Sequence, residues 1–241
     1  RYSTLGLFES LGIELGTGSA TPYYQDVSFK VNLPTENLGR FEIFGIGGKN
    51  NINFETNEGD EESNDNFYVN GDINVRNRNN MGVLGVANTF SLGQNTFGKI
   101  TVATTHVGNF NDVDSISTEN PSVEEPFYRG NFRRNKVFAS GFVNHKFNAK
   151  NNVKAGLITN HIHHSFTDSV YEAERNRFVT TRDYKGGTFL YQPYLQWQFK
   201  PNDQLTFNSG IHSQYLALND NFTFEPRVGM EWQLASGHSI N

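Results

Sequence analysis

The sequence predicts an all-β protein: an antiparallel, up-and-down transmembrane β-barrel, of which these residues form a partial sector of about nine or ten strands. Two observations predict this fold. Apolar and polar residues alternate in single runs for about a dozen residues, roughly twice the length of an ordinary strand. The connections between these runs are alternately short and long, which is typical of outer-membrane barrels and not of soluble β-sandwiches.

The composition is compatible with a barrel and excludes other classes. The chain has 241 residues, a formal net charge of −5, a mean hydropathy of −0.58 and no cysteine. No segment contains the roughly 18 consecutive apolar residues of a transmembrane helix, whereas a barrel strand exposes only alternate residues to lipid. The acidic balance argues against a nucleic-acid partner, and the lack of cysteine excludes disulfides and thiolate metal sites.

The individual elements follow from alternation and from turn residues. Residues 1–5 could end a strand, and the Gly/Ser/Thr-rich residues 6–22 are expected to form a loop. Val27, Phe29 and Val31 then alternate with polar residues, which predicts a strand. In chain order the predicted strands are residues 23–33, 40–49, 81–92, 97–110, 134–147, 152–166, 187–199, 205–215 and 225–234. The long polar stretches are predicted to be loops, at residues 50–80, 111–133 and 167–183.

The hairpin at residues 187–215 shows the two-faced pattern most clearly. Its two runs meet at the turn-forming residues 200–203, and each run has one aromatic, apolar face and one polar face. Across the chain the apolar faces predict these lipid-facing residues: Val27, Phe29, Val31, Tyr191, Leu195, Trp197, Phe207, Ile211, Tyr215, Val228, Met230 and Trp232. The polar faces predict these lumen-facing residues: Gln192, Gln196, Asn208, His212, Gln214, Arg227 and Glu231.

Two further features concern the size of the barrel and its position in a membrane. Trp197 and Trp232 lie near short turns, as expected for an aromatic girdle at the membrane interface. The polar faces are roomy, which favours a sector of a wide barrel over a closed barrel of ten strands. Strand-like patterns continue at both ends, so residues 1–241 are expected to be a single barrel segment of a larger protein.

Several stretches resemble the barrel of TonB-dependent outer-membrane receptors, in the subgroup that commonly carries an N-terminal carboxypeptidase-regulatory-like domain. The most specific are Tyr24–Thr35 and Glu225–Gly229, and the others are residues 39–41, 44–48, 82–83, 154–156 and 237–240. The resemblance implies a barrel of about 22 strands with a plugged lumen. It also implies uptake of a scarce ligand, driven when an inner-membrane TonB-type complex pulls on the plug.

The resemblance also implies a location and partners. The location is the outer membrane of a Gram-negative bacterium. The partners are outer-membrane lipid and lipopolysaccharide, the protein's own plug domain and the TonB-type complex. A surface lipoprotein or a secretion partner could dock on the outer loops. No energy-coupling segment, plug domain or terminal aromatic strand is recognised in these residues.

Candidate chemistry is sparse: no catalytic motif, metal site or cofactor motif is recognised, and the protein is not expected to be an enzyme. His161, His163 and His164 are candidate metal ligands because residues two apart share a strand face, but solvated histidines are the simpler interpretation. The acidic run at residues 58–62 lacks the spacing of a calcium loop and is interpreted as a solvated loop.

The residues leave two alternatives to a transporter open. A small outer-membrane barrel enzyme would need a closed barrel with an acid–base cluster at one end. A soluble β-sandwich adhesin or binding module would need two packed sheets without sorted loop lengths.

Arg227 and Glu231 share a polar face and are expected to pair with the plug or with neighbouring strands, because charges at membrane depth need partners.

Overall fold

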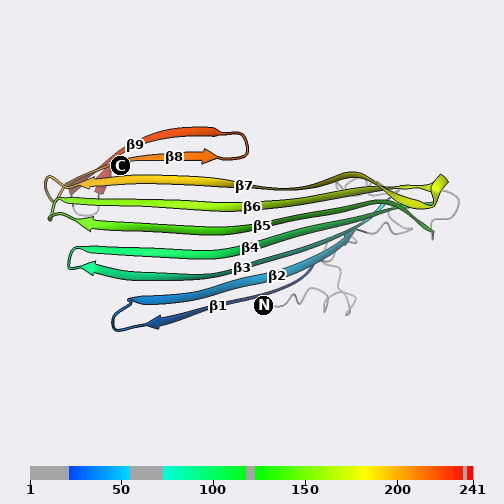
Figure 1. The fold of residues 1–241 in the computed structure, drawn as a ribbon, viewed down its shortest axis with the longest axis horizontal. Helices are drawn as coiled ribbons and strands as arrows, with labels where there is room; N and C mark the ends of the chain where they lie inside the picture. Colours follow the sequence, from blue (N-terminus) through cyan, green and yellow to red (C-terminus); the bar gives the residue numbers. More distant parts are fainter. Residues whose placement is uncertain (1–21, 55–72, 118–122, 236–237, 241) are drawn as a thin grey trace.

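The computed structural model describes residues 22–54, 73–117, 123–235 and 238–240, which form one antiparallel sheet (Figure 1). The strands lie side by side in chain order, from β1 at one edge to β10 at the other. The predicted all-β, up-and-down arrangement is therefore confirmed. Within the described residues β1 and β10 are not paired with each other, so the sheet is open, as in a sector of a barrel.

The strand bounds differ from the predicted ones mainly at one end of the sheet. The strands are β1 (Tyr23–Pro34), β2 (Arg40–Phe54), β3 (Ile73–Gly93), β4 (Thr96–Ile116), β5 (Glu124–Lys146), β6 (Asn151–Glu172), β7 (Arg177–Phe199), β8 (Leu205–Leu216), β9 (Asn221–Ala235) and β10 (His238–Ile240). A short 3-10 helix, η2 (Ala173–Arg175), joins β6 to β7. Among the described residues, no helix has the length and apolar character to cross a lipid bilayer.

The predicted short turns that join the described strands β1 to β8 in pairs lie at one end of the sheet, which we call the short-turn end (Figure 1, left). The turn between β1 and β2 shows which interactions stabilise such a turn. The Thr35 backbone N–H donates to the carbonyl of Gly39 (2.8 Å), and the Leu38 N–H donates to the Thr35 hydroxyl (3.1 Å). Gly39 has a φ of +81°, and a Cβ there would lie 2.1 Å from the Thr89 carbonyl oxygen. Glycine is therefore required at this position.

At the opposite end the strands are much longer than predicted. Strands β3 to β7 have 21 to 23 residues, about twice the 9–11 that a bilayer requires. The loop predictions were wrong where strands continue, at residues 50–54, 73–80, 111–116, 124–133, 167–172 and 177–183. We call the part of β2 to β7 beyond the Lys49–Lys185 level the extension; it consists of residues 50–54, 73–79, 109–116, 124–132, 166–172 and 177–184.

Cross-strand ion pairs hold one face of the extension together. The Asp114 side chain is 6% exposed, and its carboxylate accepts from the guanidinium of Arg76 (2.6 Å) and from that of Arg129 (2.7 Å). Arg76 also donates to Glu124, and this hydrogen bond raises the pKa of the Arg76 guanidinium. Residues with low strand propensity thus become strand residues because the neighbouring strands supply charges of opposite sign.

Asparagine side chains hold the opposite face of the extension together through hydrogen bonds. Asn79 donates to Asn50 (2.9 Å) and to Asn77, and Asn111 donates to Asn109 (2.6 Å). Asn77 donates to Asn111 and Asn109 donates to Asn79, which closes the network across β2, β3 and β4. The asparagines that indicated a loop in the sequence therefore satisfy one another in a sheet.

The β8–β9 hairpin is much shorter than its neighbours. Leu216 is paired with Leu190, and the chain turns back over residues 217–220, about halfway along β7 (Figure 1). This turn is shorter than the gap between the predicted strands 205–215 and 225–234, because β9 begins at Asn221 rather than near residue 225. Among the described strands, none pairs with Arg177–Thr188 on the side facing β8.

Candidate functional site

The two faces of the sheet differ in chemistry, and cross-strand register shows which residues share a face. Tyr191 is paired with Tyr215, Leu195 with Ile211, and Phe207 with Met230. The register continues from Tyr191 through β6, β5, β4, β3 and β2 to Val31 in β1. All twelve residues that the sequence predicts to face lipid therefore lie on one face, which we call the apolar face.

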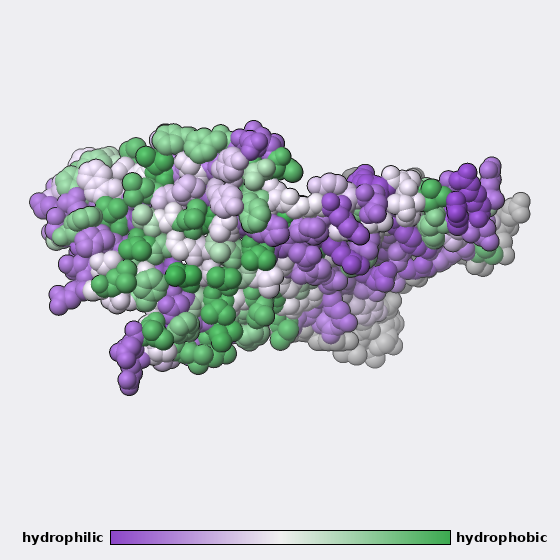
Figure 2. Space-filling model, viewed as in Figure 1, coloured by the Kyte–Doolittle hydropathy of each residue, from purple (hydrophilic) through white to green (hydrophobic). Residues whose placement is uncertain are grey.

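The apolar face is exposed in this sheet. Leu195 is 47% exposed and Val228 is 84% exposed, and the other predicted lipid-facing residues are exposed or half-buried. Figure 2 shows hydrophobic residues gathered over the part of the sheet near the short turns, and hydrophilic residues over the extension. An apolar surface of this extent is not stable in water and needs an apolar medium or partner.

An uncharged band on this face has the height of a bilayer core. On the described strands, no Asp, Glu, Lys or Arg lies on the apolar face between the level of Gly187 and that of Trp197. Ten residue steps along β7 correspond to about 33 Å. With the strand tilt of 35–45° found in barrels, the band would be about 25 Å tall, as in outer-membrane barrels.

All seven residues predicted to face the lumen lie together on the opposite face, which we call the polar face. Glu225 connects several of them. Its carboxylate accepts from Arg227 Nη2 (2.7 Å) and from Gln214 Nε2 (3.2 Å), and it lies 3.1 Å from His212 Nδ1. Gln192 Nε2 lies 3.5 Å from Gln214 Oε1. The remaining lumen-facing residues lie nearer the short-turn end, namely Gln196, Asn208 and Glu231.

Sequence reasoning missed a second charged group on the polar face. The Glu42 side chain is 10% exposed and lies 3.3 Å from both Lys30 Nζ and Lys99 Nζ and 3.6 Å from Arg40 Nη2. A carboxylate held at this depth of a barrel wall is stabilised by such partners. The available signal in the sequence was a charged residue at a polar position of an alternating run. The ion pairs themselves could not be predicted, because they depend on the register between strands.

The polar face is not uniformly polar, because apolar side chains also lie on it. Ile46 is paired with Val83, and Met81 is paired with Val107. Ile46, Met81 and Val107 are 44%, 49% and 39% exposed. Because Met81 and Val83 are two apart on β3, these four residues form one patch, which we call the inner apolar patch.

The three histidines do not come together. His161 lies on the apolar face and stacks on Phe189, with ring centroids 4.5 Å apart. His163 shares that face, whereas His164 lies on the polar face and stacks on Phe166 at 5.3 Å. In the described part of the chain, no group of three or more potential metal ligands could hold an ion. The acidic run at residues 58–62 lies outside the described residues.

Comparisons with known proteins identify the fold. No protein-family model and no curated protein sequence matches the chain. Among solved structures, the ferric yersiniabactin uptake receptor FyuA from Yersinia pestis is 10% identical with a TM-score of 0.62, and the match covers 90% of this chain and 34% of FyuA. The copper transporter OprC is 10% identical with a TM-score of 0.51, and the match covers 89% of this chain and 38% of OprC.

At this identity the likeness concerns fold alone, and the chain spans about a third of the length of each of these two proteins. The likeness extends over nearly the whole sheet, in agreement with its up-and-down order and its open edges. The chain therefore has the fold of a partial outer-membrane β-barrel.

Proposed function

We propose that the chain forms part of the barrel wall of a TonB-dependent transporter in the outer membrane of a Gram-negative bacterium. The whole protein would take up a scarce ligand by energy-coupled import. The observation that carries this proposal is the uncharged band of bilayer height on one face of a sheet whose other face is polar. Such a sheet satisfies its backbone hydrogen bonds between strands, as a membrane requires, and separates lipid from a lumen.

The inner apolar patch supports a plugged lumen rather than an open aqueous pore. Ile46, Met81 and Val107 would be poorly hydrated if they faced a water-filled channel. A plug domain, supplied by the rest of the protein, would cover them, and the charged groups around Glu42 and Glu225 would supply polar contacts to it. This account predicts that the lumen is closed at rest.

The described strands argue against both alternatives. A small barrel enzyme needs a closed barrel, whereas β1 and β10 lie at opposite edges of an open sheet. A β-sandwich needs a second sheet, whereas all the described strands belong to one sheet. The two solved structures reported above carry the descriptions of an uptake receptor and a transporter, which favours import over catalysis.

Energy-coupled import can be tested in cells that contain or lack the full-length protein. We would measure the accumulation of a labelled panel of ferric chelates, cobalamin, oligosaccharides and peptides, with and without an uncoupler of the inner membrane. The proposal predicts that at least one compound accumulates only in cells with the protein and only while the inner membrane is energised. Accumulation that is unaffected by the uncoupler, or no accumulation of any compound, would contradict it.

A conductance measurement separates a plugged barrel from an open pore. The full-length protein in a planar bilayer is expected to show no steady ion current, because the plug fills the lumen. A variant that lacks the plug domain is expected to conduct, since a barrel of about 22 strands encloses a wide channel. A steady current through the intact protein would show that the lumen is open.

A further inference from the structure

A row of cationic residues crosses the apolar face immediately beyond the uncharged band. Successive register pairs place the following residues at one level from β2 to β7: Lys49, Asn80, Gly108, Arg133, Ser165 and Lys185. Three of them carry positive charge, and we call Lys49, Arg133 and Lys185 the cation row. All three side chains are exposed, and none of the six residues is acidic.

The described carboxylates of this face lie further out, in the extension, and all except Asp183 are paired with arginine. Asp112 accepts from Arg78 at 2.6 Å, and Asp114 accepts from Arg76 and Arg129. Among the described residues, no carboxylate forms an ion pair with any residue of the cation row. Within the described residues, the row is therefore a line of positive charge that no ion pair neutralises.

Phe110 and Asp183 lie beside the cation row on the same face. The Arg133 guanidinium lies over the ring of Phe110, with its carbon 5.4 Å from the ring centroid. Asp183 is two residues from Lys185 on the same face, and its carboxylate lies 3.4 Å from the Thr167 hydroxyl. One carboxylate beside three cations leaves the level positively charged, so an anionic ligand is favoured.

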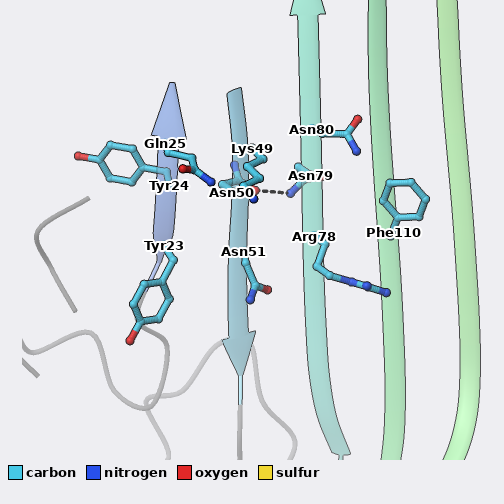
Figure 3. A pocket seen from close by; sticks show the side chains of 10 residues that line it. All are labelled: Tyr23, Tyr24, Gln25, Lys49, Asn50, Asn51, Arg78, Asn79, Asn80 and Phe110. Carbon is cyan, nitrogen blue, oxygen red and sulfur yellow. Dashed lines mark hydrogen bonds between the residues drawn. The ribbon is translucent and has the colours of Figure 1, made fainter. Parts of the chain in front are cut away.

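An open hollow of about 480 Å³ adjoins the Lys49 end of the row (Figure 3). On the apolar face its lining combines amide, phenol and cationic groups from β1 to β4: Tyr23, Gln25, Lys49, Asn51, Arg78, Asn80 and Phe110. Amides and phenols hydrogen-bond to hydroxyl groups, and aromatic rings pack on the apolar faces of sugars. The hollow therefore has the chemistry of a site for a sugar that carries a nearby anion.

We propose that the cation row binds the phosphate groups of lipopolysaccharide in the outer leaflet, and that the hollow receives the adjoining sugar. This inference rests on the proposed function, which places the end of the sheet opposite the short turns outside the cell. The row lies two residues along each strand, about 7 Å, beyond the last uncharged level, where lipid headgroups begin.

The spacing of the row decides what it can hold. Lys49 and Arg133 are three strands apart, about 14 Å, and Arg133 and Lys185 are two strands apart, about 10 Å. A single phosphate cannot reach all three, so the row suits a lipid with more than one phosphate or several neighbouring lipids. Arginine and lysine both bind phosphate oxygens through charge-assisted hydrogen bonds.

The test compares lipopolysaccharide retained by the full-length protein after purification in detergent. The row variant carries Lys49→Gln, Arg133→Gln and Lys185→Gln. The control variant carries the same loss of charge at the short-turn end, at Lys146, Lys150 and Lys200, which are also exposed. The row variant is expected to retain lipopolysaccharide at least about tenfold less than the parent, and the control variant as much as the parent. Equal retention by the row variant and the parent would overturn the proposal.

Two measurements on the unmodified protein keep the test independent of variant folding. Lipopolysaccharide stripped of its phosphates is expected to bind at least about tenfold more weakly than the intact lipid, and equal binding would overturn the phosphate assignment. Inorganic phosphate is the probe for a free-anion site, and it is expected to leave the lipid bound. Displacement of the lipid by low concentrations of phosphate would also overturn the proposal.

The outcomes separate this inference from the proposed function. A protein that imports its ligand but retains no lipopolysaccharide refutes the cation row alone. A protein that binds lipopolysaccharide but shows no energy-dependent import refutes the transporter and leaves the row supported.

Discussion

Replacement of Leu195 by arginine is expected to destabilise the full-length barrel by about 1–3 kcal/mol, because the penalty of about 2–4 kcal/mol for Arg or Lys at the bilayer midplane falls toward the interfaces. Leu195 lies inside the uncharged band, two residues from its Trp197 end, 47% exposed, between Ala155 on β6 and Ile211 on β8. No described carboxylate lies on the apolar face at this depth to accept the guanidinium. The measurement is urea-induced unfolding of the protein refolded into phospholipid vesicles.

The matched control is Gln192→Arg, on the polar face of the same strand. Gln192 is a better control than Gln196, which lies directly opposite Lys154. An arginine at residue 192 would face the lumen and the Glu225 group, so a loss below about 1 kcal/mol is expected. Equal losses at residues 192 and 195 would show that the two faces of β7 do not meet different solvents.

Replacement of Asp114 by alanine is expected to destabilise the extension by about 2–3 kcal/mol. The change leaves the guanidinium groups of Arg76 and Arg129 without their shared carboxylate, and breaking a buried pair costs about 3–5 kcal/mol. The Arg76 and Arg129 side chains are 35% and 33% exposed, so water recovers part of that loss.

Hydrogen exchange of backbone amides measures this effect locally. Amides at residues 73–78 and 124–129 are expected to lose protection, while those of the uncharged band are unchanged, because the extension opens as a separate unit. Asp183→Ala is the control, since Asp183 is exposed and has only a weak contact with Thr167, and a change within about 0.5 kcal/mol is expected. Full protection in the Asp114 variant would show that the ion pairs do not hold the extension.

The faces of the sheet could be predicted from the sequence because a strand has a period of two. Tyr191, Leu195 and Trp197 are odd-numbered neighbours on one strand, and any antiparallel partner must continue their face. The short turns were also predictable, because turn residues such as Gly39 and Asn148 have local conformational or hydrogen-bonding roles.

The extension could not be predicted from the sequence because its stability comes from partners far along the chain. Asn77 and Asn111 are 34 residues apart, and each alone indicates a loop. Glu42 was missed for the same reason, since its contact with Lys99 spans 57 residues and depends on register across three strands. Short alternating runs specify a face, whereas register emerges only when the whole sheet is assembled.

Spin labels on alternate residues of β7 test the central claim, that this sheet stands between lipid and lumen, most directly. The chain contains no cysteine, so single cysteines at residues 191, 193, 195 and 197 and at residues 192, 194, 196 and 198 can each carry a label in the full-length protein in lipid vesicles. The odd positions are expected to be accessible to lipid-soluble oxygen and shielded from a water-soluble nickel chelate, and the even positions are expected to be shielded from oxygen. Odd positions that are shielded from both reagents, as in a protein core, would contradict a membrane-facing sheet.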